Sequence, residues 1–329
     1  MPSNANDDLR GSGDSWPGES ADDASGRRRR AKGDPGYERE PDALADRDDI
    51  LTVPVAPVHR LTSLAIAAFG GLLGLALVFG AYTSSRQFAL VIFGVQLIFV
   101  VSWTVATRPP GPRVVAAVGL ITAAVGDIAV AWPTHATVAP LGYVTAGGFI
   151  LGALGQLARR TSRDRVTESL GSTLVMVVGV MAYATLIVLA RHKLGVQSIA
   201  ACLTAATVAI VVARLTDVVL PFPRTTPQVA RGTIGIVLGA MLGTVASAFV
   251  ASGLQGMSPK HTVLPGLVTA VAAVLADLGV GYAEASREID GEVGSLWLVR
   301  HMQGPLAGFA LAAPVAYVMS VLVLVPALN

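Results

Sequence analysis

Four charged side chains lie inside long apolar runs of the sequence: Asp127, Arg214, Asp217 and Asp277. A charge at the centre of a membrane helix costs about 2.5–3.5 kcal/mol on insertion scales, so each needs a partner or a water-filled cavity. Arg214 and Asp217 are three residues apart, which places them on one face of a helix and within reach of each other. This spacing fits an internal ion pair, and it equally fits a polar or metal-linked site.

Asp277 differs because the sequence has no basic residue within one helical turn of it. A cation from another helix must balance the carboxylate, or a proton must neutralise it. We therefore take Asp277 as the leading candidate for a functional residue. Asp127 lies in a weaker apolar run that ends at Trp132-Pro133, and we expect it near the outer end of a helix, either solvated or packed.

The elements that carry these residues are expected to be membrane helices. The chain is 53% hydrophobic and 14% charged, where soluble domains have about a quarter charged residues. About 20 apolar residues cross a bilayer as a helix, and the alternation of a barrel strand is absent. The sequence predicts an all-α, polytopic membrane helical bundle with about nine spans, at 61–83, 88–107, 114–132, 138–158, 170–190, 196–220, 232–254, 263–283 and 306–327.

The N-terminal segment has a different composition. Thirteen of the 22 acidic residues precede residue 50, and no apolar periodicity is present there, so residues 1–58 are expected to form a disordered, charged tail. About four spans in 59–165 and the remainder in 166–329 would follow. With a cytoplasmic tail, 19 basic residues face the inside and four the outside. This predicts a multi-pass protein of the cell membrane with its N-terminus inside and its C-terminus outside.

Other features exclude or restrict function. Cys202 is the only cysteine, so no intramolecular disulfide forms, and no basic field points to nucleic acid. The sequence contains no phosphate-binding glycine loop, dinucleotide fingerprint, nucleophile elbow or zinc-protease motif. The Gly235 and Gly239 pair permits close helix packing, and a homo-oligomer interface is the alternative use of such pairs. The bias toward Ala, Val, Gly and Arg is typical of a GC-rich bacterial proteome.

The last third of the chain resembles the phosphatidate cytidylyltransferases, the CDP-diacylglycerol synthases. Ala276-Asp-Leu278 stands where that family has Gly-Asp-Leu, Gly294-Ser-Leu296 follows, and Ala312-Ala-Pro-Val-Ala-Tyr317 is similar to the start of the last family helix. Upstream, Arg214-Leu-Thr-Asp217 and Thr226-Pro-Gln-Val-Ala-Arg-Gly232 stand where the family has Ser-Asp-Thr-Gly and Ser-Pro-Lys-Lys-Thr-x-Glu-Gly. Ala307 occupies the position of the final family aspartate, and Gln228-Val229 replace the paired lysines.

The resemblance implies transfer of a cytidylyl group from CTP to phosphatidate, with release of pyrophosphate. Divalent metal and cationic side chains hold the charge that develops in such a reaction. Asp277 and Asp217 would then bind Mg²⁺. The polar stretch from Glu284 to Pro305 is expected to be a loop, and its part Glu284–Arg300 would surround them in one cytoplasm-facing cavity. The phosphate-binding candidates are Arg214, Arg224 and Arg300. The candidates for a rearranged catalytic site beside Asp277 are Arg287, Glu292 and His301.

The departures at Ala307 and Gln228 predict an impaired or altered activity in phospholipid metabolism. The protein would then keep the scaffold and bind phosphatidate or another anionic lipid, with CTP as a further ligand if catalysis persists. Two other classes stay open from the sequence. One is a transporter or channel component, supported by the intramembrane charges and glycine-rich spans, although no inverted repeat is visible. The other is a non-catalytic scaffold whose charged tail recruits partners.

Overall fold

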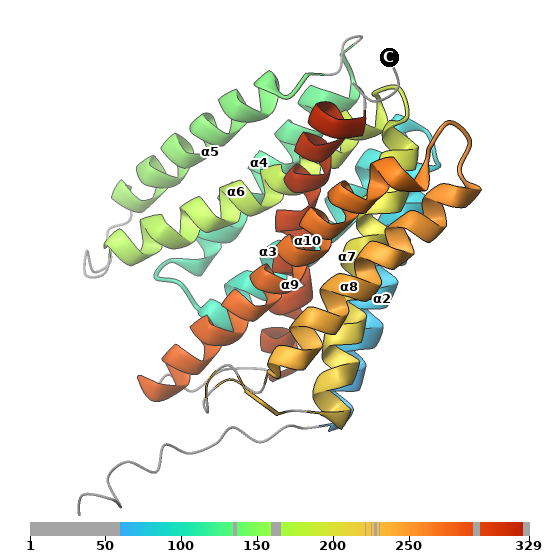
Figure 1. Cartoon of the computed structure of the whole chain (residues 1–329). Coiled ribbons are helices and arrows are strands. Elements are labelled where there is room, and N and C mark those ends of the chain that lie inside the picture. Colours follow the sequence, from blue (N-terminus) through green and yellow to red (C-terminus); the bar gives the residue numbers. More distant parts are fainter. Residues whose placement is uncertain are drawn as a thin grey trace, which may run out of the picture. The chain divides into compact units, whose positions relative to one another are not determined.

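The computed structural model describes residues 60–133, 137–158, 166–220, 222–224, 226, 229, 231–291 and 297–324. The expected tail at 1–58 and the candidate Glu292 lie outside these residues. The described part of the chain is all-helical, with helices α2 (Arg60–Ala81), α3 (Ser85–Thr107), α4 (Pro112–Ala131), α5 (Ala139–Leu157), α6 (Val166–Ala190), α7 (Gly195–Val219), α8 (Thr233–Gly253), α9 (Pro259–Ile289) and α10 (Trp297–Met319), followed by the π-helical turn Ser320–Leu324 (Figure 1).

Eight of the described helices are long and apolar enough to cross a membrane. The helix that falls short of that criterion is α5, whose 19 residues include five glycines, one proline and the polar Gln156 near its end. The predicted membrane helical bundle is therefore confirmed, and its helices match the nine expected runs in order. The protein is a multi-pass membrane protein.

The helices pack in two groups joined by α10. In the first group α7 contacts α2, α8 and α9, and in the second α4 contacts α3, α5 and α6 (Figure 1). Helix α10 contacts α9 and α7 on one side and α6 and α3 on the other. The buried Tyr183 of α6 donates a hydrogen bond of 2.6 Å to the Leu306 carbonyl of α10, so this contact also satisfies a hydroxyl inside the bundle.

Small residues bring α7 and α8 together. A Cβ atom at Gly239 would lie 2.5 Å from the Ala209 carbonyl oxygen, and one at Gly243 would lie 2.5 Å from that of Ala205. Both positions therefore need glycine for this backbone approach, as small-residue spacing predicts. The interface positions α8 against the end of α7 that carries Arg214 and Asp217.

The polar stretch 284–305 is not one long loop, in contrast to its expected form. Helix α9 continues to Ile289 and α10 begins at Trp297, so most of the stretch extends the two helices beyond the apolar runs. Glu, Ala and Arg favour helix, which explains why α9 continues past its last apolar turn. The consequence is that Glu284 and His301 are positioned by rigid helices.

Candidate functional site

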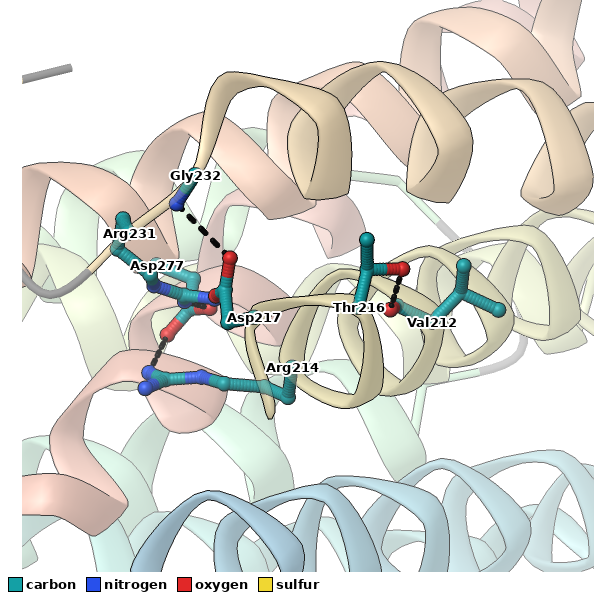
Figure 2. Close-up of polar contacts among 7 residues, drawn as sticks. All are labelled: Val212, Arg214, Thr216, Asp217, Arg231, Gly232 and Asp277. Atoms are coloured by element: carbon teal, nitrogen blue, oxygen red, sulfur yellow. Dashed lines mark hydrogen bonds and ion pairs between the residues drawn. The ribbon is translucent and has the colours of Figure 1, made fainter. Parts of the chain in front are cut away.

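The polar site lies at the end of the bundle where α7 and α9 finish and where α8 and α10 begin, which we call the site end. Along α2, Gly70 lies beside Ile210 of α7 and Gly74 lies beside Thr207, so α2 runs antiparallel to α7 and also starts at this end. Four buried or nearly buried charged side chains meet at this end: Arg214, Asp217, Arg231 and Asp277 (Figure 2). The sequence suggested that Arg214 and Asp217 pair with each other. In the structure Arg214 pairs with Asp277, and Asp217 pairs with Arg231.

Asp217 is held by the segment that leads into α8. Its Oδ1 accepts a hydrogen bond of 2.9 Å from the Gly232 amide, and its Oδ2 accepts one of 3.0 Å from Arg231 Nη1 (Figure 2). This segment folds back on itself, because the Thr233 amide donates to the Pro223 carbonyl at 2.9 Å. The fold-back places Arg231 inside the bundle, where the whole residue is 4% exposed.

Asp277 of α9 is fully buried and contacts two arginines. Arg214 Nη2 donates to its Oδ1, and Arg231 Nη2 forms an ion pair with its Oδ2. The cation required by its position therefore comes from α7 and from the connection to α8. Gly304 of α10 lies directly over this contact, and a Cβ atom there would collide with Asp277 Oδ1 and lie 2.7 Å from Arg214 Nη2.

The four residues form a neutral network of two cations and two anions, with Arg231 between the carboxylates. Burial and the neighbouring Arg214 lower the pKa of Arg231 to about 9, while Asp217 and Glu284 act in the opposite direction. Arg231 is therefore a cation at neutral pH. Removing one partner of a buried pair is strongly destabilising because the other charge stays buried without compensation.

A polar cavity of about 100 Å³ adjoins this network. It is lined by Arg214, Arg231, Val280, Gly281, Glu284, His301 and Gly304. One water requires about 10–15 Å³ of such volume, so the cavity has room for several waters or for a small polar group. Arg214 Nε and Glu284 Oε1, both on lining residues, are buried without a hydrogen bond within the described residues. The cavity thus offers both a donor and an acceptor to a ligand.

The remaining candidates from the sequence are placed around this cavity or away from it. His301 lines it, whereas Arg300 bonds Glu288 at 3.0 Å and ties α10 to α9 outside it. Arg287, in the last turn of α9, and Arg224, whose guanidinium lies 5.1 Å from the Phe222 ring centroid, do not line it. The structure therefore brings together Arg214, Asp217, Asp277 and His301.

The arrangement does not fit the magnesium site implied by the resemblance. Both oxygens of Asp217 and both oxygens of Asp277 already contact nitrogen donors or cations of the chain. Among the described residues, no three His, Cys, Asp or Glu side chains gather where they could hold a metal ion. Arginine side chains, and not an ion, supply the positive charge between these carboxylates.

Two residues of the site were not singled out from the sequence. Arg231 was noted only as part of Thr226–Gly232, and Glu284 only as part of the polar stretch. The signal for Arg231 was available, because Asp277 needed a cation from outside α9 and Arg231 directly precedes the predicted span 232–254. Nothing in the sequence indicated that the connection before α8 turns inward.

Comparison with known proteins adds no relative to this description. No protein-family model matches the chain, and none of the curated proteins matches it. The class of protein is therefore defined by the fold and the site themselves: a multi-pass helical membrane protein with a buried arginine–aspartate network beside a polar cavity.

Proposed function

We propose that the protein binds the phosphate-bearing polar group of a lipid in the cavity beside Arg214 and Arg231, as a divergent relative of the CDP-diacylglycerol synthases. The observation that carries the proposal is the convergence of two arginines from different segments on one polar cavity at the site end. Arginine presents a planar set of donors that matches phosphate oxygens, and such charge-assisted bonds are about twice as strong as neutral ones.

The unsatisfied atoms of the cavity support this ligand chemistry. Arg214 Nε is a buried donor without an acceptor among the described residues, and a phosphate oxygen would supply one. Glu284 Oε1 is a buried acceptor for which the described part of the chain supplies no hydrogen-bond donor, and a hydroxyl or amino group attached to the phosphate would supply one. A phosphate with a neighbouring hydroxyl or amine therefore supplies hydrogen-bond partners for both atoms, whereas a simple carboxylate supplies a partner only for Arg214 Nε.

The position of the cavity supports a lipid as the source of the phosphate. It is enclosed by α7, α9 and α10, close to the ends of membrane-spanning helices, where lipid head groups lie. The excess of basic residues, 19 against four, favours the cytoplasm for this end. Phosphatidate is the lipid that the family resemblance implies, and a role in phospholipid metabolism follows from it.

Binding is tested with purified protein in detergent micelles, using dioctanoyl phosphatidate and, as its match without phosphate, dioctanoylglycerol. We expect phosphatidate to bind more tightly, and Arg214→Gln to weaken phosphatidate about tenfold or more while leaving dioctanoylglycerol unchanged. Arg113→Gln is the control, since Arg113 is an exposed arginine at the start of α4 on the same side of the bundle. Equal affinity for both lipids would contradict the proposal.

The same preparation distinguishes lipid binding from binding of a free phosphate compound and from turnover. Competition by inorganic phosphate or CTP alone, without an effect of the acyl chains, would assign the site to a soluble ligand. With CTP, magnesium and phosphatidate together, we expect no pyrophosphate release above that of protein-free micelles, because the acidic residues are paired with arginine. Release that Asp277→Asn abolishes would show that cytidylyl transfer persists.

A further inference from the structure

A second cavity lies at the opposite end of the bundle, where α3 begins and α4 and α6 end. Arg191, just after α6, connects the ends of α6 and α4 here, since its Nη1 donates a hydrogen bond of 2.5 Å to the Val130 carbonyl of α4. The cavity measures about 270 Å³ and is almost wholly apolar. Its lining residues come from α3, from α4 and from the residue that follows α4. They are Arg86, Ala89, Leu90, Phe93, Ala124, Asp127, Ile128, Ala131 and Trp132. We call it the Asp127 groove.

Asp127 is the acidic residue of this groove, and of the two alternatives that the sequence left open, solvated or packed, the structure shows it packed. Its whole residue is 4% exposed. Its Oδ1 accepts a hydrogen bond of 3.0 Å from Gln96 Nε2, and its Oδ2 is buried with no hydrogen-bond partner in the described part of the chain. An unpaired carboxylate oxygen at an apolar cavity is costly, and a ligand that donates a hydrogen bond or carries positive charge would offset that cost.

The groove is open along the outside of the bundle. Leu90, Ile128 and Trp132 line it and are exposed, so in a membrane it faces lipid or the interface beside it. The guanidinium of Arg86 lies 5.1 Å from the centroid of the Trp132 ring, which holds this cation at the exposed mouth of the groove. An aromatic face and a buried acid, with aliphatic walls between them, match an ammonium group attached to an apolar body.

We propose that the Asp127 groove binds an amphiphilic organic amine, with the ammonium group at Asp127 Oδ2 and the apolar body along Leu90, Phe93 and Ile128. The site is separate from the cavity at Arg214, because the two lie at opposite ends of the helices. Its ligand class also differs, since one site offers arginine donors and the other a single carboxylate in an apolar wall. The inference therefore does not depend on the phosphate-binding proposal.

The test uses 2-phenylethylamine and its neutral match 2-phenylethanol, with the protein in nanodiscs of phosphatidylcholine, and measures dissociation constants by ligand-observed NMR titration. We expect the wild type to bind the amine more tightly than the alcohol. Asp127→Asn should weaken amine binding about tenfold or more and leave alcohol binding unchanged, because it removes the charge and keeps an acceptor for Gln96. Arg86→Gln should not weaken the amine.

A second variant keeps the test independent of any folding defect in Asp127→Asn. Ala124→Leu fills the groove and retains the carboxylate, so it should weaken both probes. Equal binding of amine and alcohol by the wild type would mean that an apolar chain occupies the groove, and would overturn the proposal. The absence of amine binding, or amine binding unaffected by either variant, would overturn it as well.

Discussion

The buried carboxylates at the two ends of the bundle have different kinds of partner. At the site end, Asp217 and Asp277 share Arg231, and Asp277 also contacts Arg214. At the other end, Asp127 has an amide neighbour, Gln96, and an oxygen that no described residue hydrogen-bonds, at an apolar groove. The comparison shows that burial of an acid alone does not define its role, since the partners decide whether its charge is structural or available to a ligand.

The difference has an energetic consequence. In the network, each charge depends on the others, so removal of one leaves a buried charge that the protein cannot solvate. Asp127 forms no ion pair with any residue that the structure describes. We therefore expect large, coupled effects on stability at the site end and small, local effects at the Asp127 groove.

The largest effect is expected for Arg231→Ala, which leaves Asp217 and Asp277 with one arginine between them. The free energy of unfolding should fall by about 3–5 kcal/mol, the range for breaking a buried ion pair. Denaturation by SDS in mixed micelles measures it. Arg224→Ala in the same connection is the control and should cost much less, because the guanidinium of Arg224 lies over the exposed ring of Phe222. Equal losses of unfolding free energy for the two variants would show that the ion-pair network contributes no more to stability than the rest of the connection, and would contradict the prediction.

A smaller loss, about 1–3 kcal/mol, is expected for Gly304→Ala, because the new methyl group collides with the contact between Asp277 and Arg214. Gly279→Ala in α9 is the matched control, since a Cβ atom there meets nothing within 4 Å. The control should be neutral or slightly stabilising, as alanine favours helix over glycine. Thermal unfolding of both proteins in one detergent provides the comparison, and a stable Gly304→Ala would indicate looser packing than described.

Asp127→Asn should change stability by less than about 1 kcal/mol. The amide keeps an acceptor for Gln96 Nε2, and no cation loses its partner. The same unfolding assay measures this variant beside those of the network. A loss as large as that of Arg231→Ala would show that Asp127 belongs to an ion-pair network of its own.

The smallest effect is expected for Glu288→Gln, which removes the ion pair with Arg300 between α9 and α10. The Glu288 side chain is 61% exposed, and exposed pairs contribute about 0.2–1 kcal/mol. The effect should shrink further when salt is added, because solvent ions screen the pair. A loss that is large and independent of salt would place this pair inside the polar network.

The helices could be predicted from the sequence because twenty apolar residues in a row have few stable alternatives in lipid. The need of Asp277 for a cation from another segment followed in the same way, from the cost of a lone charge. The helical ends 284–289 and 297–305 were missed because a polar stretch after an apolar run carries no mark that separates a loop from an extended helix.

The partners of the charges could not be predicted, because they depend on how segments distant in sequence pack. The spacing of Arg214 and Asp217 suggested a pair along α7, but their best partners come from α9 and from the connection before α8. The partner of Asp127 could not be predicted for a similar reason. The sequence left Asp127 either solvated or packed, and the structure pairs it with Gln96 of α3, whose Nε2 also donates to the Val180 carbonyl of α6.

A double-mutant cycle between Arg231 and Asp277 tests most directly whether the charges at the site end act as one network. The free energy of unfolding is measured for the wild type, Arg231→Met, Asp277→Asn and the double variant in one detergent. We predict that the double variant is more stable than the sum of the two single losses implies, with a coupling of about 1–3 kcal/mol. Losses that add within about 0.5 kcal/mol would show that the two side chains act independently, and would contradict the account.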